Sequence, residues 1–226
     1  MVNQLCKLAG GVFFLTLILM ASGCGSSNAQ LRALQASPDE TNGLNILVDG
    51  NTLFSAVALG APTGYTSVSS GSHHLQVEVP GSTTPVIDET ISLGGGGHYT
   101  FMTANFASSL TPVLLSDDKT APSSGEVNIR AVHAGAGIGN VDVFILGPGN
   151  SPIGATPAIT NLAFGAASSY QSLAAGSYEI FFNAAGGTTT YVDTGSLSFT
   201  AGQNRTIVLV PSAFGGFSWS VLPDLN

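Results

Sequence analysis

The chain contains an internal duplication. Residues 60–97 align without a gap onto residues 165–202, a block of 38 positions. Eleven of these positions are identical, including Tyr65 with Tyr170, whereas about three identities are expected from composition alone. Each copy spans about 90 to 100 residues, near the common size of one domain. The sequence therefore predicts two tandem domains of the same fold.

The copies also match before this block, because residues 31–36 align with residues 129–134. The alignment shift grows from 98 to 105 between the two matches, so the second copy holds seven extra residues. We place them at the turn-rich stretch 147–152, since surface loops tolerate insertions. The predicted domains are residues 31–118 and 127–226, with a linker at 119–126.

Hydrophobic residues alternate with a period of two, which is typical of β-strands. Leu75 and Val77 follow this pattern in the first copy, as do Ile180 and Phe182 in the second. We expect further strands near residues 31–36, 44–48, 64–69, 85–93, 98–104 and 111–116, with a hairpin turn at 49–50. About seven short strands per copy predict two tandem antiparallel β-sandwich domains of immunoglobulin-like type.

The first 23 residues have the layout of a secretory signal. Lys7 precedes an apolar run at residues 8–20, which is too short to span a bilayer. Residues 21–24 (Ala-Ser-Gly-Cys) resemble the lipobox of bacterial lipoproteins, which implies that Cys24 is lipidated and becomes the first residue of the mature chain, with residues 24–30 as a tether. The alternative is an ordinary signal peptide cut elsewhere, such as after Ala29.

The lipoprotein interpretation accounts for both cysteines. Cys6 leaves with the signal and Cys24 carries lipid, so no thiol remains for a disulfide, a metal site or a nucleophile. Two or three acyl chains suffice for stable membrane attachment. We expect the cell envelope as the location, and Gly25 after the cysteine favours the outer membrane by resemblance to the enterobacterial sorting rule.

The charge balance argues against nucleic acid as a partner. The chain has 13 acidic and five basic side chains and a formal net charge of −8. Binding to a phosphate backbone requires clustered Lys and Arg, and the sequence has no such cluster.

Two segments at the start of each copy resemble a known bacterial family. Residues 31–39 (Leu-Arg-Ala-Leu-Gln-Ala-Ser-Pro-Asp) and 44–50 resemble the start of the domain of unknown function 4397, as do residues 129–134, 141–144 and 173–178 of the second copy. The second copy lacks the Ser-Pro-Asp turn. The resemblance implies a secreted or surface-attached β-sandwich, and it supplies no catalytic residues.

Metal binding is tested by the repeat itself, because a ligand shared by both copies must survive in each. The aligned pairs are His73 with Tyr178, His74 with Glu179, His98 with Gln203 and His133 with Gln35. No histidine recurs as a histidine, so we expect hydrogen-bonding roles and neither a metal nor another cofactor. The paired acids at 39–40 and 117–118 lack the spacing of a calcium loop, and we interpret them as solvated loop charge.

The sequence offers no enzyme signature. It lacks a Gly-x-Ser-x-Gly elbow and a His-Glu-x-x-His helix. The glycine-rich stretch 135–139 is followed by a strand pattern rather than a helix, so we interpret it as a plain turn. We therefore expect no catalytic residues.

The repeated charged and aromatic residues are structural candidates. Arg32 and Arg130 occupy equivalent positions, and Asp88 and Asp193 are equivalent acids. We expect each arginine to anchor its own domain by pairing with that domain's aspartate. Tyr65 and Tyr170 resemble a tyrosine corner, in which the hydroxyl bonds a backbone group.

Three aromatic residues near the C-terminus allow two interpretations. Phe214, Phe217 and Trp219 are suited to stacking on a sugar ring or contacting a partner. However, Phe217 and Trp219 share one strand parity with Val221, which favours core packing.

These observations together predict a membrane-anchored lipoprotein that serves as a non-catalytic binding or surface-structural module. One alternative is a carbohydrate or small-ligand binder that uses the loops at one end of a sandwich. Another is a hydrolase-like enzyme with a loop-built site. A protein or glycan partner is compatible with both the non-catalytic module and the carbohydrate or small-ligand binder.

The lipidation prediction is tested by metabolic labelling with an alkyne fatty acid. We expect the wild-type protein to take up the label and the Cys24→Ala variant to lose it, because the thiol that carries lipid is removed. Label retained in the variant would show that the lipobox interpretation is wrong.

Overall fold

The computed structural model describes residues 27–226, so the predicted signal and Cys24 lie outside the described residues. Within this range the fold is all-β, with sixteen strands in four four-stranded sheets and one short 3₁₀ helix, η1 (Ala107–Ser109). No helix in residues 27–226 has the length and hydrophobicity that crossing a membrane requires.

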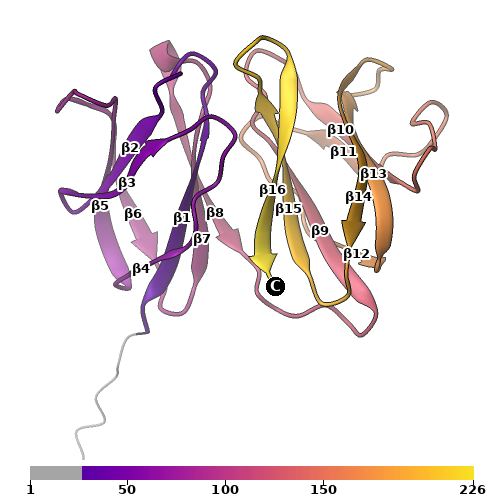
Figure 1. Ribbon diagram of the computed structural model, residues 1–226, viewed down its shortest axis with the longest axis horizontal. Coiled ribbons are helices and arrows are strands. Elements are labelled where there is room, and N and C mark those ends of the chain that lie inside the picture. The colour runs from indigo at the N-terminus through magenta and orange to yellow at the C-terminus, as the bar shows by residue number, and fades with distance from the viewer. Residues whose placement is uncertain (1–26) are drawn as a thin grey trace, which may run out of the picture.

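Each repeat folds into two facing sheets, and the two repeats stand side by side (Figure 1). The first repeat has the sheet orders β4-β1-β7-β8 and β3-β2-β5-β6. Its strands are β1 (Ala29–Ala36), β2 (Leu44–Val48), β3 (Asn51–Val57), β4 (Thr66–Val68), β5 (Gly71–Glu78), β6 (Pro85–Leu93), β7 (His98–Ala104) and β8 (Thr111–Asp117).

The second repeat has the same topology, with sheet orders β12-β9-β15-β16 and β11-β10-β13-β14. Its strands are β9 (Glu126–His133), β10 (Val141–Leu146), β11 (Ile159–Leu162), β12 (Gln171–Ala174), β13 (Gly176–Ala184), β14 (Thr190–Phe199), β15 (Asn204–Pro211) and β16 (Phe217–Leu225). Identical strand order in both halves is what a duplicated sequence predicts.

The expectation of purely antiparallel sheets is wrong at one pairing in each repeat. β1 runs parallel to β7, with Arg32 opposite Thr100. β9 runs parallel to β15, with Arg130 opposite Thr206. Hydrophobic alternation reports which face of a strand is buried and carries no information about the direction of its neighbour, so the pattern did not indicate this pairing.

The strand positions agree closely with the sequence pattern. Residues 85–93 and 98–104 are strands with the predicted bounds, and the predicted hairpin joins β2 to β3. Asp49 and Gly50 form its turn with φ of 51° and 77°, the left-handed backbone that a two-residue hairpin loop requires. Each repeat has eight strands rather than about seven.

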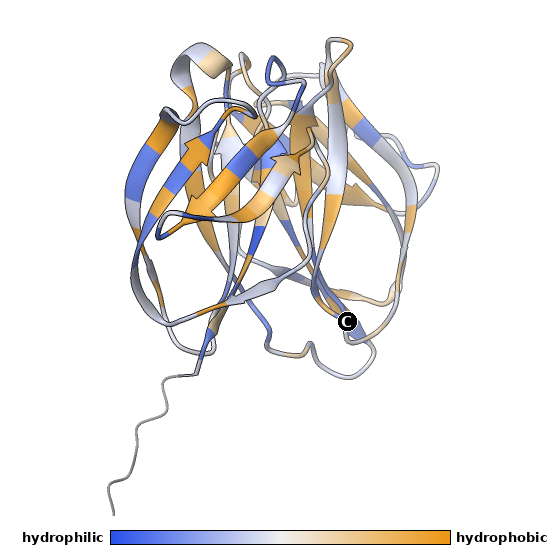
Figure 2. Cartoon of the chain, turned by 60° about the vertical axis from the view of Figure 1, so that its left-hand side comes forward, coloured by the Kyte–Doolittle hydropathy of each residue, from blue (hydrophilic) through white to orange (hydrophobic). Residues whose placement is uncertain are grey.

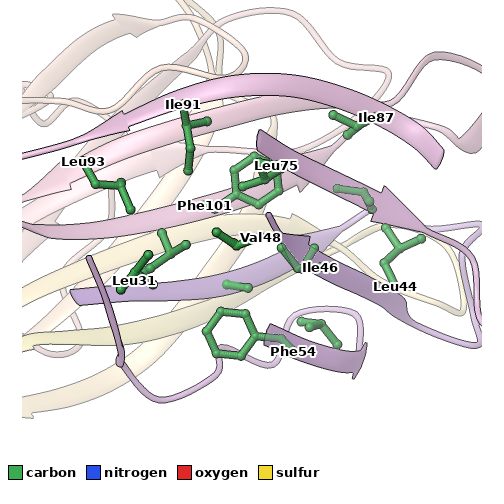
Figure 3. Packing of buried hydrophobic residues seen from close by; sticks show 14 of the residues in the cluster. Leu31, Leu44, Ile46, Val48, Phe54, Leu75, Ile87, Ile91, Leu93 and Phe101 are labelled. Atoms are coloured by element: carbon green, nitrogen blue, oxygen red, sulfur yellow. The ribbon is translucent and has the colours of Figure 1, made fainter. Parts of the chain in front are cut away.

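Each sandwich encloses its own core. In the first repeat, Leu31, Ile46, Leu75 and Phe101 meet between the sheets (Figure 3). An equivalent cluster around Phe182 fills the second repeat. Hydrophobic and hydrophilic residues alternate along many of the strands (Figure 2), as expected where one face of a sheet is buried.

A third cluster lies between the repeats. β1 is buried on both faces: Leu31 and Ala33 pack into the first core, whereas Leu34 and Ala36 pack against the second repeat. The same holds for the equivalent strand β9, in which Val132 faces the first repeat. The two sandwiches therefore share an interior interface, called the seam below.

Substituting either of two glycines, Gly43 and Gly50, places a side chain on a left-handed backbone, but only one of the two substitutions also creates a clash. Gly43 and Gly50 both have a φ of 77°, but a Cβ on Gly43 would lie 2.7 Å from the carbonyl carbon of Ala56, whereas Gly50 faces open space. We expect Gly50→Ala to lower the free energy of unfolding by about 1–2 kcal/mol, the cost of the left-handed backbone. Gly43→Ala should cost about 1–3 kcal/mol more than Gly50→Ala, because the clash is added to the backbone cost. Urea denaturation of the two variants checks this, and equal losses would contradict the contact.

Candidate functional site

The seam joins the outer faces of sheets β4-β1-β7-β8 and β12-β9-β15-β16. Its apolar part is a cluster of small and medium-sized side chains from both repeats. The fully buried members are Leu34, Ala36, Met102, Ala104, Val132, Ala134, Val208, Val210 and Leu222. Burial of this apolar surface favours the docked arrangement.

A buried charge cluster completes the seam, and its first half is built around Arg32. Only 1% of Arg32 is exposed. Its Nε donates to Thr100 Oγ1 at 2.8 Å on the neighbouring strand β7. Its two terminal nitrogens cross to the other repeat, where Nη1 donates to the carbonyl of Pro223 at 2.8 Å and Nη2 pairs with Asp224.

Arg130 makes the same set of contacts in the opposite direction. Its Nε donates to Thr206 Oγ1 at 2.6 Å within its own repeat. Its Nη1 donates to the carbonyl of Ser116 at 2.8 Å, and its Nη2 pairs with Asp117 of the first repeat. Each arginine therefore pairs with the aspartate of the other repeat, so the two repeats make equivalent contacts with each other.

The carboxylates are satisfied by their own repeats as well. Tyr65 and Thr100 each donate to Asp117 at 2.6 Å, and Arg32 adds a longer contact at 3.4 Å. Two arginines and two aspartates meet here, so the buried formal charges balance. This balance matters because an unpaired buried charge is costly.

Asp224 has the equivalent surroundings in the second repeat. Tyr170 donates to it at 2.8 Å and Thr206 at 2.6 Å. The guanidinium carbon of Arg130 lies 4.8 Å from the centre of the Tyr170 ring, and Arg32 lies 4.6 Å from that of Tyr65. These are cation–π contacts, which add to the ion pairs.

Both tyrosines remain hydrogen-bond donors. The pKa of Tyr65 and that of Tyr170 are well above the ordinary value for a phenol. The main cause is burial, and the second is the adjacent carboxylate. Each hydroxyl therefore keeps its proton and donates it to the aspartate. The prediction of a tyrosine corner bonded to the backbone is wrong, because both hydroxyls bond carboxylates.

The predicted pairing of the arginines with Asp88 and Asp193 is also wrong. Asp88 is exposed on β6 and accepts hydrogen bonds from His74 at 2.6 Å and Gln76 at 3.1 Å. Asp193 is exposed on β14 and accepts a bond from the backbone N–H of Gly195 at 2.8 Å. Both strands belong to the sheets away from the seam, so neither carboxylate reaches an arginine.

The interpretation of Asp117 as solvated loop charge is wrong as well, since this residue is only 5% exposed at the end of β8. Asp39, in the other acidic pair, accepts hydrogen bonds from Ser37 and from the backbone N–H of Ala107, and it thereby joins two loops of the first repeat.

Four members of the cluster were not predicted from the sequence: Asp117, Asp224, Thr100 and Thr206. A signal was present, because the threonines recur 106 positions apart and the aspartates 107. The gapless alignment ends at residues 97 and 202, before these pairs. The strand pairings place one extra residue just before β15, since Asn204 lies opposite Asn128 as His98 lies opposite Gln30. They place another in the turn between β15 and β16.

His73 and His74 point to opposite faces of β5, as predicted, with His73 buried and His74 exposed. His73 lies 2.7 Å from Asp49 and 2.7 Å from the carbonyl of Ser69. The hydrogen bond to Asp49 raises the pKa of His73 above its ordinary value. Its ring therefore holds the turn between β2 and β3 against β5.

His98 and His133 lie on the seam-side sheets. His98 is 3.0 Å from Lys119, and burial lowers its pKa. His133 is 3.0 Å from the carbonyl of Gly139, and burial lowers its pKa also. The equivalent residue Gln35 likewise bonds carbonyls of the turn after its strand. Within residues 27–226, no three His, Cys, Asp or Glu side chains come together in a group suited to a metal ion.

Strand direction divides the molecule into two ends. β1, β7, β9 and β15 all run the same way in Figure 1, so the turns that follow them, at 37–43, 105–110, 134–140 and 212–216, gather at one end, called the distal end. The start of β1, the linker after β8 and the C-terminus lie at the opposite end, called the tether end.

The linker is held in place at the tether end. The side chain of Asn204 is completely buried and donates to the carbonyls of Asp118 and Thr120, both at 2.9 Å.

Two clefts lie between the repeats toward the distal end. The larger, called the seam cleft, has a volume of about 250 Å³. Its lining residues are Leu59 and Gly60 from the first repeat and Val210, Pro211, Ser212, Ala213, Phe214, Ser218, Trp219 and Ser220 from the second. The smaller, of about 170 Å³, lies between Pro38 and Phe106 of the first repeat and the hairpin formed by β15 and β16 in the second.

The aromatic residues of this hairpin divide between core and surface. Phe217 and Trp219 pack against the second core, which confirms the interpretation from strand parity. Phe214, which was not part of that parity argument, is fully exposed in the turn between β15 and β16. Trp219 is only partly buried and also lines the seam cleft.

The reciprocal ion pairs predict a large effect of removing one partner. We expect Arg130→Ala to destabilise the protein by about 3–5 kcal/mol, because the carboxylate of Asp117 stays buried after its arginine partner is removed. This corresponds to a fall in melting temperature of about 10 °C. The matched control Asp88→Asn removes the charge from the exposed contact with His74 and should leave the melting temperature nearly unchanged. An unchanged melting temperature for Arg130→Ala would contradict the structural role of the pair.

Solved structures that are distantly similar to this chain include two carbohydrate-binding modules. A family 26 carbohydrate-binding module of Eubacterium rectale Amy13K, solved with maltoheptaose, shares 10% identity over 86% of this chain and 96% of that chain, with a TM-score of 0.26. A family 41 carbohydrate-binding module from streptococcal virulence factors, described as recognising alpha-glucan, shares 12% identity over 80% of this chain and 93% of that chain, with a TM-score of 0.27. Scores this low carry no argument about ligand.

A comparison with curated proteins found no significant match. The model of the family "Domain of unknown function (DUF4397)" matches residues 29–144 and 150–226, and it agrees with the resemblance seen at the start of both repeats. The chain therefore belongs to the DUF4397 family.

Proposed function

We propose that this protein is a non-catalytic binding module of the bacterial cell envelope, tethered by lipid on Cys24 and presenting its distal end to a ligand. The observation that carries the proposal is the separation of its two ends. The start of β1 lies at the tether end, whereas both clefts between the repeats lie toward the distal end.

The position of β1 supports attachment through Cys24 over cleavage after Ala29. Ala29 is completely buried and pairs with Val68. Cleavage after Ala29 would therefore remove a residue of the first core. Only residues 25–28 separate Cys24 from β1, and four extended residues span at most about 15 Å. Such a tether holds the first strand close to the membrane surface.

The seam supports presentation of a single binding surface. Two sandwiches joined by a flexible linker alone would move independently. Here the apolar cluster and the two cross-repeat ion pairs bury the interface, so loops from both repeats keep a defined arrangement. Both clefts depend on that arrangement, because each has walls from both repeats.

The chemistry of the clefts suits binding without catalysis. The described residues that line them include no Asp, Glu, His, Lys or Cys, so the lining serines have no acid or base among their neighbours in the clefts to activate them. The lining side chains are aliphatic, aromatic, small or hydroxyl-bearing. Such a surface supplies contact area and hydrogen bonds.

Site-specific photo-crosslinking in the native host tests which end of the molecule meets a ligand. A benzophenone side chain at position 214 probes the distal end, and one at exposed Ser124 in the linker is the matched control at the tether end. We expect illumination to give adducts at position 214 and none at position 124, because the clefts lie beside Phe214. Equal adducts at both positions, or none at 214, would contradict the proposal.

A further inference from the structure

We propose that the seam cleft binds one ring of a neutral carbohydrate chain, with Trp219 and Phe214 as its aromatic contacts. This inference rests on the proposed function of the distal end and names the ligand class of that surface. The cleft combines the partly buried indole of Trp219, the fully exposed ring of Phe214 and the hydroxyls of Ser212 and Ser218.

The charges argue for a neutral ligand. Of the ten described residues that line the seam cleft, none carries a charge. A carboxylate, phosphate or ammonium group entering the cleft would lose water without gaining an ion pair, which is unfavourable. A sugar ring has an apolar C–H face and a rim of hydroxyl groups. It therefore matches a lining of aromatic rings, serine hydroxyls and backbone groups.

The size of the cleft limits the bound unit. Pockets for drug-sized ligands measure about 300–1,000 Å³, and the seam cleft, at about 250 Å³, is below that range. One ring of a chain is the size of unit that this volume suits. Because Phe214 projects into solvent beside the cleft, the rest of the chain can continue over the distal end.

Both repeats build the cleft, and one contact joins its walls. Ser220 on β16 donates a hydrogen bond to the carbonyl of Gly60 in the first repeat. Gly60 has a φ of 69°, and a Cβ there would lie 3.5 Å from Val210 Cγ2. The seam thus fixes the distance between the Leu59–Gly60 wall and the aromatic wall.

The first repeat lacks the aromatic residue that the second repeat contributes to the seam cleft. The residue of β8 equivalent to Trp219 is Pro112: Pro112 pairs with Thr103 on β7, just as Trp219 pairs with Leu209 on β15. The aromatic contact is therefore absent at that position of the first repeat. Packing of the seam alone does not require this difference, because the ion pairs are preserved on both sides.

Tryptophan fluorescence reports on the cleft directly, since Trp219 is the one tryptophan in the whole sequence. The probes are maltoheptaose, cellohexaose and chitohexaose, with oligogalacturonate as the acidic control. We expect a saturable change in emission with at least one neutral oligosaccharide and none with the acidic one. We expect Phe214→Ala to weaken that affinity about five- to tenfold, the loss typical of one aromatic contact.

Phe214→Ala is suited to this test because Phe214 is fully exposed and the fold does not depend on it. The matched control is Ile153→Ala, which removes another exposed hydrophobic side chain, in the loop between β10 and β11, and should leave binding unchanged.

No emission change with any neutral oligosaccharide up to about 10 mM would overturn the inference. So would equal binding of oligogalacturonate, or full affinity in the Phe214→Ala variant. Adducts from the benzophenone at position 214 together with no sugar binding would reject the carbohydrate ligand while leaving the distal binding surface in place. Absence of both would reject the proposed function as well.

Discussion

The reciprocal ion pairs at the seam are the interaction on which the rest of the structure depends. Arg32 and Arg130 are buried, and each finds its strongest acidic partner in the other repeat. A buried charge is tolerated only when it is paired and hydrogen-bonded, so neither repeat satisfies its arginine fully by itself. The apolar cluster around Leu34 and Val208 favours docking, and the ion pairs select one register, because a shifted interface would leave four buried charges unpaired.

This seam links the fold to the distal end. Because β1 is parallel to β7 and β9 is parallel to β15, the turns that follow these four strands lie at the same end of the molecule. Docking the two repeats then brings the turns of both together, and the clefts form between them. A surface composed of loops from two domains has a defined shape only while the domains are locked. The buried polar cluster at the tether end and the clefts nearer the distal end are thus two parts of one arrangement.

The period of two, the hairpin turn and the duplication were readable in the sequence because they depend on local geometry. Side chains alternate between faces along any strand, and an Asp-Gly pair favours the left-handed turn that Asp49 and Gly50 form. The partners of Arg32 and Arg130 were not readable in this way. Asp88 and Asp193 were chosen because they recur in the gapless block, whereas Asp117 and Asp224 lie beyond the extra residue at which that alignment ends.

The sequence by itself determined that this protein is all-β, that it consists of two copies of one unit, and that it belongs to the DUF4397 family. It also marked the repeated arginines and tyrosines as structural residues, without their partners. Only the tertiary structure decided that the copies exchange ion pairs across a buried seam and that a cleft containing Trp219 lies between them. The physical reason is that contacts between residues as far apart as Arg32 and Asp224 depend on how sheets dock, and no local pattern of side chains encodes that docking.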